Sequence, residues 1–280
     1  MMTAAGARTH RRPHAIVQGV TTIDGSVALH HEVTGPEDGQ VVLLGSSLGT
    51  TLAMWDGQVA RLSERFRVVR FDHRGHGGSP VPPEPYAIAD LGRDVLALLD
   101  ALGVERASYC GLSIGGMVGM WLAANAPHRI DRLVLLCTSA HFPPAEAWTE
   151  RAAAVQQAGS TEAVADAVLA RWLTPEFARA RPEALAALRA MLVACPPAGY
   201  AGCCRAIGRM DLRADLPRIR APTLVVAAAQ DPATPPEHLE RIAAAIPDAR
   251  LELLSPSAHI AAVERASDVT RLISGHLADG

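Results

Sequence analysis

The sequence predicts an α/β fold, a mostly parallel and doubly wound sheet with a helical cap inserted into it. Two observations carry this prediction. Short apolar runs of strand length recur along the 280 residues, and helical patterns separate most of them, as in sheets whose parallel strands are joined by helices. Between about residues 140 and 210 only helical patterns appear, so this segment is expected to lie over the sheet.

Six apolar runs are the expected strands. They are VVLL (41–44), RVVRF (67–71), ASYC (107–110), LVLLC (133–137), TLVVAAA (223–229) and LELL (251–254). Strands of a parallel sheet are buried on both faces, and they therefore appear as continuous apolar runs. Most of these runs fit that description, so the sheet should carry helices on both faces.

The helices are indicated by apolar residues at helical spacing. In IADLGRDVLALLDALG, the side chains of Leu91, Val95 and Leu98 fall on one face, which is the pattern of an amphipathic helix. Within the expected cap, TEAVADAVLARWL and PEALAALRAMLVA show the same spacing. Each segment therefore has one apolar face to bury.

We divide the chain into a core of residues 15–139 and 211–280 and a helical cap of residues 140–210. Prolines flank the cap, in FPPAEAW at its start and in ADLPRIRAP after it, and prolines commonly interrupt regular elements. Residues 1–14 contain arginines without a following apolar segment. A flexible N-terminal extension is expected here, and not a signal peptide.

Composition excludes several classes of function. The chain has no lysine, and all 26 of its basic residues are arginine, so Schiff-base and phosphate-loop lysine chemistry is excluded. The net charge of -3 gives no general attraction to nucleic acid or an anionic membrane. No apolar run approaches the roughly 20 residues that span a bilayer. Five cysteines without the dense spacing of a disulfide scaffold favour reduced thiols, and we expect a cytoplasmic location.

Ser113 lies in GLSIG, a G-x-S-x-G pattern between an expected strand and an expected helix. This context predicts a nucleophile elbow, in which a serine occupies a sharp strand-to-helix turn and exposes its hydroxyl. Glycine is needed at Gly111 and Gly115 because a side chain there would collide with neighbouring backbone. A glycine-rich bend of the mononucleotide-binding kind is the alternative, and the pattern alone does not exclude it.

Asp231 and His259 supply the partners that a nucleophilic serine requires. Asp231 follows the strand TLVVAAA, and His259 follows the strand LELL, so the chain order is serine, aspartate, histidine, as this elbow requires. His259 would take the proton from Ser113, and Asp231 would hold the imidazole in the tautomer that accepts it. Each residue alone has an ordinary explanation as a loop residue. The three in order, each just after a strand, predict a catalytic triad.

Backbone amides are expected to bind the oxyanion. The amide of Ile114, which follows the nucleophile, is the first donor, and Ser47 in LLGSSLGT is the second. An ordinary glycine-serine turn would have the same sequence. The candidate substrate contacts are Leu48, His141, Trp148 and Trp172, although tryptophans on cap helices are more often core residues.

No metal or cofactor is expected. His73 and His76 lie in DHRGHGGS, a glycine-rich loop after a strand, and this favours a turn scaffold over a metal site. No other group of cysteines and histidines has zinc-like spacing. Cys203 and Cys204 are expected to pack in a helix as small buried side chains.

Together these motifs resemble the α/β-hydrolase superfamily, and within it the 3-oxoadipate enol-lactonases of the β-ketoadipate pathway. FDHRGHGGS, GLSIGG, QD and AH are features of the superfamily. More specific are SSLGTTLAMWDGQ (46–58), GYAGCCRAIGRMDLR (199–213) and QDPATPPEHLERIAAAIPDARLELL (230–254). The resemblance spans about residues 15–277, and it implies an α/β-hydrolase fold.

The resemblance implies hydrolysis of a five-membered enol-lactone with a carboxymethyl arm to 3-oxoadipate, without a cofactor. Ser113 would attack the lactone carbonyl, and water activated by His259 would clear the acyl-enzyme. The carboxylate of the arm should need a cation. Related lactonases have an arginine at the cap entrance where this sequence has His141 in CTSAHF, and Arg171 and Arg205 are the other candidates.

Two other functions stay open. A broader carboxylesterase or perhydrolase of the same superfamily would use the same triad. A ligand-sensing homologue would keep the triad but act through movement of its cap. The expected partner is a small lactone or ester that bears a carboxylate. No nucleic-acid or membrane partner is expected, and the oligomeric state is left open.

Overall fold

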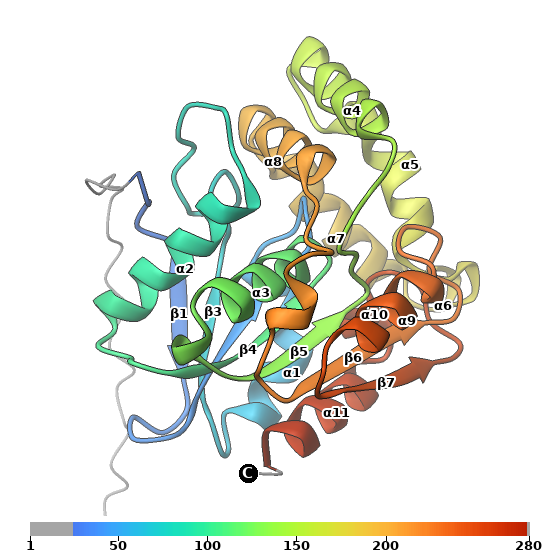
Figure 1. Cartoon of the computed structure of the whole chain (residues 1–280). Coiled ribbons are helices and arrows are strands. Elements are labelled where there is room, and N and C mark those ends of the chain that lie inside the picture. Colours follow the sequence, from blue (N-terminus) through green and yellow to red (C-terminus); the bar gives the residue numbers. More distant parts are fainter. Residues whose placement is uncertain (1–24, 279–280) are drawn as a thin grey trace, which may run out of the picture.

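The computed structural model describes residues 25–278, and its central element is one seven-stranded sheet (Figure 1). The strands are β1 His31–Thr34, β2 Val41–Gly45, β3 Arg67–Phe71, β4 Ala107–Leu112, β5 Ile130–Leu136, β6 Thr223–Ala228 and β7 Ala249–Leu254. They lie in the order β1-β3-β2-β4-β5-β6-β7, and only the pairing of β1 with β3 is antiparallel. The predicted mostly parallel sheet is confirmed, whereas the extension expected at residues 1–14 lies outside the described residues.

β1 is the strand that the sequence did not predict. Its residues, HEVT, are half-buried at every position, whereas β2 and β4 are buried throughout. The difference arises because, among residues 25–278, β1 lies at one edge of the sheet and pairs with β3 alone. A strand at the edge of the sheet needs no continuous apolar run, so the polar residues of β1 do not show the pattern that predicts a strand.

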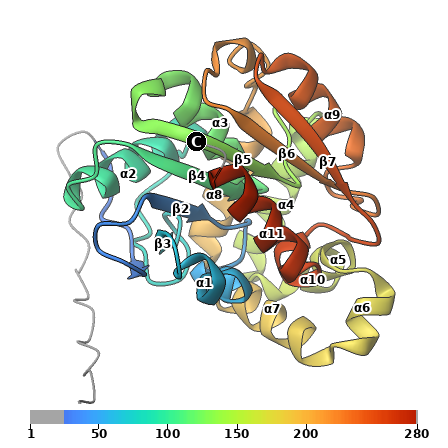
Figure 2. The same cartoon turned by 90° about the horizontal axis from the view of Figure 1, so that it is seen from below.

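Two groups of helices cover the faces of the sheet (Figure 2). The helices of the core are α1 Asp56–Leu62, α2 Ile88–Ala101, α3 Ile114–Asn125, α9 Pro236–Ala245, α10 Ala261–Glu264 and α11 Ala266–Ala278. On one face α1, α10 and α11 pack together, and on the other α2 packs against α3 while α9 contacts β6 and β7. Both faces of the sheet are therefore covered, as its apolar strands require.

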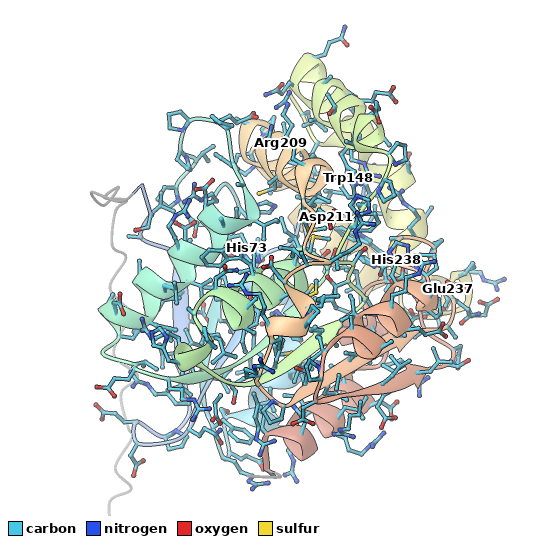
Figure 3. All side chains as sticks on the ribbon, viewed as in Figure 1. His73, Trp148, Arg209, Asp211, Glu237 and His238 are labelled. Carbon is cyan, nitrogen blue, oxygen red and sulfur yellow. The ribbon has the colours of Figure 1, made fainter. Side chains whose placement is uncertain are left out.

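The cap consists of helices that lie above the carboxyl ends of the parallel strands (Figure 1). They are α4 Ala145–Ala158, α5 Glu162–Trp172, α6 Pro175–Ala180, α7 Pro182–Ala194 and α8 Pro197–Arg209. α4 packs against α8, and α5 packs against α7. The chain enters and leaves the cap side by side, because His141 and Asp211 form an isolated antiparallel bridge. Figure 3 shows Asp211 at this junction, below Trp148 of α4.

The cap is held closely on the core by α8. A Cβ atom on Gly199 would lie 2.1 Å from the carbonyl oxygen of Gly75, so the two backbones touch. Nearby, Arg205 donates to both carboxylate oxygens of Glu84, at 2.8 and 2.7 Å. These contacts fix α8 on the loops that follow β3.

In the part of the chain that the structure describes, no single helix has both the length and the apolar character needed to cross a membrane. The pair α7 and α8 meets the same test of length and composition only when it is taken together across a bend of 94°.

Candidate active site

Ser113 occupies a strained turn between β4 and α3. Its backbone has φ 59° and ψ -118°, and Ser113 and Cys137 are the non-glycine residues of the described chain with positive φ. A Cβ atom on Gly111 would lie 2.2 Å from the carbonyl oxygen of Gly115, and one on Gly115 would lie 2.3 Å from that of Gly45. The two glycines of GLSIG are therefore required by close backbone approach, and an unfavourable backbone conformation at a serine is characteristic of functional sites.

Hydrogen bonds from two neighbouring strands hold this turn. The amide of Ser113 donates to the carbonyl of Leu136 in β5 at 3.0 Å, and the hydroxyl of Thr138 donates to the carbonyl of Ser113 at 2.7 Å. On the other side, the amide of Gly115 donates to the carbonyl of Ser46 at 3.2 Å. The position of the serine is thus set by the rigid centre of the sheet.

His259 and Asp231 form a buried hydrogen-bonded pair. The Nδ1 atom of His259 lies 2.8 Å from Oδ2 of Asp231, and both side chains are at most 5% exposed. Asp231 follows β6 and His259 follows β7, which are adjacent parallel strands, so their carboxyl ends bring the two residues together. The pairing leaves Nε2 as the nitrogen of His259 that is available to a substrate.

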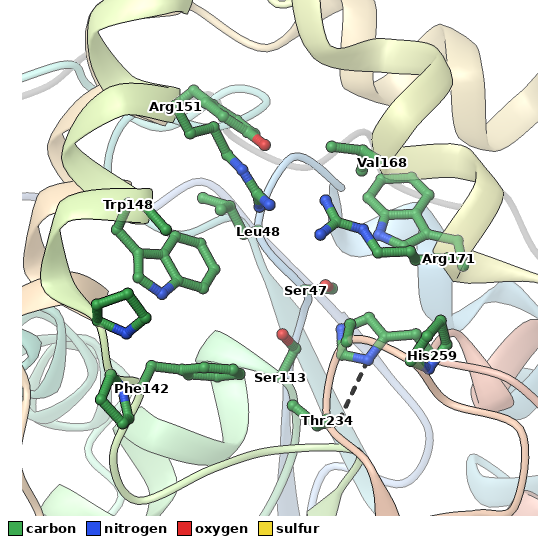
Figure 4. Close-up of a pocket in the computed structure, with 17 residues that line it drawn as sticks. Ser47, Leu48, Ser113, Phe142, Trp148, Arg151, Val168, Arg171, Thr234 and His259 are labelled. Atoms are coloured by element: carbon green, nitrogen blue, oxygen red, sulfur yellow. Dashed lines mark hydrogen bonds between the residues drawn. The ribbon is translucent and has the colours of Figure 1, made fainter.

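Thr234 completes the surroundings of the Asp231 carboxylate. Its amide donates to Oδ1 at 3.0 Å and its hydroxyl to Oδ2 at 2.5 Å, and the hydroxyl oxygen also lies 3.3 Å from Nδ1 of His259 (Figure 4). Burial alone would raise the pKa of Asp231, but His259 and the hydrogen bonds from Thr234 together lower it below its ordinary value. The carboxylate therefore stays ionised beside the imidazole.

Ser113 and His259 line one cavity of about 210 Å³ between the core and the cap (Figure 4). Of the residues expected to contact substrate, Leu48, Trp148 and Trp172 line this cavity, and so does Ser47. Sequence analysis did not identify Phe142, Val168 and Tyr200, which add to the apolar part of the lining. Apolar walls with a few polar groups are typical of sites for small molecules.

Two guanidinium groups enter the same cavity from the cap, Arg151 from α4 and Arg171 from α5 (Figure 4). Arg151 lies over the ring of Trp148, 4.7 Å from its centroid. Burial and the positive charge of Arg151 lower the pKa of Arg171. Within residues 25–278, neither arginine forms an ion pair with a carboxylate. The cavity thus has two positive charges that an anionic ligand could neutralise.

Two residues considered for the substrate carboxylate lie elsewhere. His141 lines a separate surface cavity with His238 and Arg213, because its backbone bridge to Asp211 holds it at the junction of cap and core. Arg205 faces Glu84 and forms an ion pair with it. His141, predicted as a substrate contact, therefore does not line the cavity that holds Ser113, and of the candidate cations only Arg171 reaches it.

Arg151 is the charged residue of this cavity that sequence analysis missed. It follows Trp148 by three residues in α4, and side chains three apart lie on the same face of a helix. With Trp148 as a candidate substrate contact, this spacing is the signal that would place Arg151 at the same cavity. Arginines on helices are usually solvated, so the spacing alone does not predict a ligand contact.

One free backbone amide follows Ser113 in the chain, and others lie in the lining of the cavity. Ile114 is the first residue of α3, so its N–H has no partner within the helix. Ser47 and Leu48 also line the cavity, and neither of their backbone amides donates a hydrogen bond within the described structure. These N–H groups are able to stabilise a negative oxygen in the cavity.

Two buried histidines hold the loop that carries Ser47. His76 accepts a hydrogen bond at Nε2 from the amide of Gly49 at 2.9 Å, and His73 donates from Nε2 to the carbonyl of Ser46 at 3.2 Å. Burial, with a contribution from the neighbouring His76, lowers the pKa of His73 to about 3. Both act as uncharged supports of the loop, and no group of three or more side chains that could hold a metal ion occurs among residues 25–278.

Comparison with known proteins finds a matching family model and several similar hydrolases. A family model described as the alpha/beta hydrolase fold matches residues 40–266. 3-oxoadipate enol-lactonase 2 of Acinetobacter baylyi is 40% identical over 85% of this chain and 89% of its own length. A putative carbamate hydrolase, RutD, of Variovorax paradoxus is 35% identical over 89% of this chain and 96% of its own.

Solved structures show the same relationship. The enol-lactonase from Burkholderia xenovorans LB400 is 40% identical, with a TM-score of 0.89 over 94% of this chain and 100% of that one. A thermophilic esterase from Thermogutta terrifontis, solved with malate bound, is 30% identical, with a TM-score of 0.86 over 93% of this chain and 98% of that one.

Proposed function

Because the chain belongs to the alpha/beta hydrolase family, we propose that it is a serine hydrolase that opens 3-oxoadipate enol-lactone to 3-oxoadipate. The observation that carries this proposal is the composition of one cavity. It combines Ser113 and His259 with Arg151 and Arg171, for which the described residues provide no carboxylate partner. An ester-cleaving group and a cationic pocket together suit a lactone that bears a carboxylate.

In the first step of the proposed mechanism, Ser113 Oγ attacks the lactone carbonyl. His259 accepts the serine proton at Nε2, and Asp231, bonded to Nδ1, stabilises the imidazolium. The negative oxygen of the tetrahedral intermediate is bound by the amide of Ile114 and by that of Ser47. Such preorganised donors are each worth roughly 10² to 10³ in turnover.

Collapse of the intermediate breaks the bond between the acyl carbon and the ring oxygen. The ring oxygen leaves as an enolate, which takes up the proton held by His259 and tautomerises to the ketone, and the acyl group stays on Ser113. His259, neutral again, then removes a proton from a water molecule, which attacks the acyl-enzyme. Collapse of this second intermediate breaks the bond to Ser113 Oγ, which regains a proton from His259, and releases the second carboxylate. All groups that these steps require are side chains and amides of the chain, and no cofactor is involved.

The substrate's own carboxylate would be bound by Arg151 and Arg171. Arginine suits this task because its planar guanidinium can donate two parallel hydrogen bonds to one carboxylate. The relatives support an acidic ligand, since two of them carry the name enol-lactonase and a third was solved with malate, a dicarboxylate. We also propose a cytoplasmic location, which suits the five cysteines of the chain, all free and buried.

One assay tests the proposal. Turnover is measured side by side on 3-oxoadipate enol-lactone, an acyl homoserine lactone and p-nitrophenyl acetate. We expect the highest kcat/KM for the enol-lactone, and a loss of about 10⁴-fold or more in Ser113→Ala. Activity that survives in Ser113→Ala at the wild-type level would contradict the proposed nucleophile.

A broader carboxylesterase or perhydrolase is the second candidate, and the esterase among the relatives favours it. It predicts good hydrolysis of p-nitrophenyl acetate with little action on the enol-lactone. A carbamate substrate belongs in the same comparison because of the RutD relative. A ligand-sensing homologue predicts slow turnover with a large ligand-induced rise in Tm, and fast multiple turnover would eliminate it.

A further inference from the structure

The last strand of the sheet, β7, presents an exposed apolar edge. It pairs with β6 on one side, and no strand of the described structure pairs with its other side. Leu251 is 39% and Leu253 57% exposed, and these are two of the four large apolar side chains that residues 25–278 expose. An edge of this kind is a template for pairing with another strand.

The backbone of β7 shows which residues face outward. The carbonyls of Asp248 and Leu254 accept hydrogen bonds from the amides of Thr223 and Ala229, so even-numbered residues point toward β6. The N–H and C=O groups of successive residues in a strand point to opposite sides. The free N–H and C=O groups at the edge therefore belong to the odd-numbered residues Ala249, Leu251 and Leu253.

Charge in β7 alternates in a self-complementary way. Arg250 and Glu252 are two residues apart, and a guanidinium nitrogen of Arg250 lies 3.4 Å from Oε1 of Glu252. Both side chains are nearly half-exposed. If two copies of β7 pair antiparallel with Leu251 opposite Leu251 of the partner subunit, each Arg250 faces a Glu252. Centring the pair on Arg250 or on Glu252 instead would place identical charges opposite each other, which is unfavourable.

We propose that β7 is a self-association surface, and that two copies of this chain pair through it in the antiparallel register centred on Leu251. In this register the outward-facing residues are directly opposite one another, Leu251 with Leu251 and Ala249 with Leu253. Each would donate and accept one hydrogen bond with its counterpart. The occupant of the edge is thus a second copy, because the charge pattern matches itself in that register. The proposal does not depend on the proposed enzymatic function.

Charge reversal tests the register. Arg250→Glu and Glu252→Arg each give a strand whose two charges are alike, and dimerisation of either variant alone should weaken by roughly tenfold or more. An equimolar mixture of the two variants should dimerise like the wild type, because every opposing pair in the heterodimer is then of opposite sign. The double variant, in which the charges are exchanged, should also recover. Sedimentation velocity across a series of protein concentrations measures each case.

Matched variants separate the edge from general surface effects. Leu251→Lys should weaken dimerisation, whereas Val193→Lys, at a comparably exposed apolar residue in the cap, should leave it unchanged. Thermal unfolding of every variant verifies that the fold is retained. A wild-type chain that is monomeric at all concentrations overturns the proposal, as does a dimer that the single reversals leave intact. Rescue by mixing would not occur if the partner were another protein or another face of this one.

Discussion

Arg151 and Arg171 are the residues that give the cavity its charge. They enter it from different helices of the cap, and the charge of Arg151 together with burial lowers the pKa of Arg171. Two like charges in one partly buried space repel each other, and a bound carboxylate would relieve that repulsion. The pair therefore favours anionic ligands over neutral ones of the same shape.

Replacing either arginine should change substrate preference more than reactivity. For Arg151→Gln and for Arg171→Gln we expect KM for a carboxylate-bearing lactone to rise by about 10- to 100-fold, since each removes a charged hydrogen bond. Hydrolysis of p-nitrophenyl acetate, which has no carboxylate, should change by less than about threefold. Steady-state kinetics on both substrates gives the comparison.

The control for these variants is Arg205→Gln. Arg205 lies on the same cap but is paired with Glu84 outside the cavity, so its loss should leave both KM values close to those of the wild type. If Arg205→Gln and Arg151→Gln had the same effect, the arginines would act through the stability of the cap and not through the substrate.

At this scale the sequence predicts where the proposed reactive groups lie better than where the proposed binding groups lie. Ser113, Asp231 and His259 each follow a strand, and the carboxyl ends of parallel strands meet at one edge, so their proximity follows from the order of elements. His141 and Arg151 depend instead on how the cap helices are rotated over the core. A bridge to Asp211 turns His141 away, and no local pattern in the sequence gives that rotation.

Among the elements, the loop after β3 supports the proposed oxyanion loop through two buried histidines. His73 donates to Ser46, and His76 accepts from Gly49. The hydrogen bond that His76 accepts requires an uncharged ring, and the pKa of each histidine is lowered, chiefly by burial. The geometry of the loop is therefore linked to pH.

The sign of this link follows from the direction of the shift. The pKa of His73 falls from 6.5 to about 3 on folding, so the unfolded chain binds a proton that the folded chain does not. The free energy of unfolding is then highest above pH 6.5 and falls as the pH decreases from there toward 3. Between pH 7.5 and pH 5, His73 alone should reduce it by about 2 kcal/mol.

His73→Gln tests this contribution. Glutamine keeps an N–H donor but does not titrate, so the fall in the free energy of unfolding between pH 7.5 and pH 5 should be smaller in the variant by about 2 kcal/mol. Urea unfolding at both pH values gives the difference. His128→Gln replaces an exposed histidine and should show the same pH dependence as the wild type. An equal dependence in His73→Gln would mean that His73 is charged in the folded state.

The strands show which secondary-structure elements an apolar sequence pattern predicts and which it does not. The six apolar runs that were predicted are strands, because a strand covered on both faces must be apolar throughout. Within the part of the chain that the structure describes, β1 pairs along one edge only, and it is half-buried, so its composition resembles that of a loop. β7 is also an edge strand, but it carries enough leucine to be predicted, and the same leucines are the ones left exposed.

At the scale of the whole molecule, the placement of the cap depends on contact between two glycines. The backbones of Gly75 and Gly199 approach so closely that no side chain fits at either position. This contact lies between the cap and a loop of the core, and it sets the height of α8 above the cavity. The cap boundaries that we infer from sequence, residues 140–210, include this helix.

Gly199→Ala should separate the cap from the core. The added Cβ atom would lie 2.1 Å from Gly75, and such overpacking typically costs about 1–3 kcal/mol. We expect a lower Tm and a higher KM for the lactone. Gly275→Ala is the control, because no atom lies within 4 Å of a Cβ atom there and alanine favours a helix by about 1 kcal/mol. A Tm of Gly199→Ala equal to that of the wild type would show that the contact is not maintained in solution.

The division between core and cap has a consequence for the evolution of this chain. The proposed reactive groups come from loops of the core, whereas both arginines and both cavity tryptophans lie within residues 145–172 of the cap. We expect mutations confined to that short segment to change which molecules are accepted without altering the proposed reactive groups. Laboratory libraries that randomise residues 145–172 also leave the contact between Gly75 and Gly199 intact, so they are an efficient route from one substrate to another.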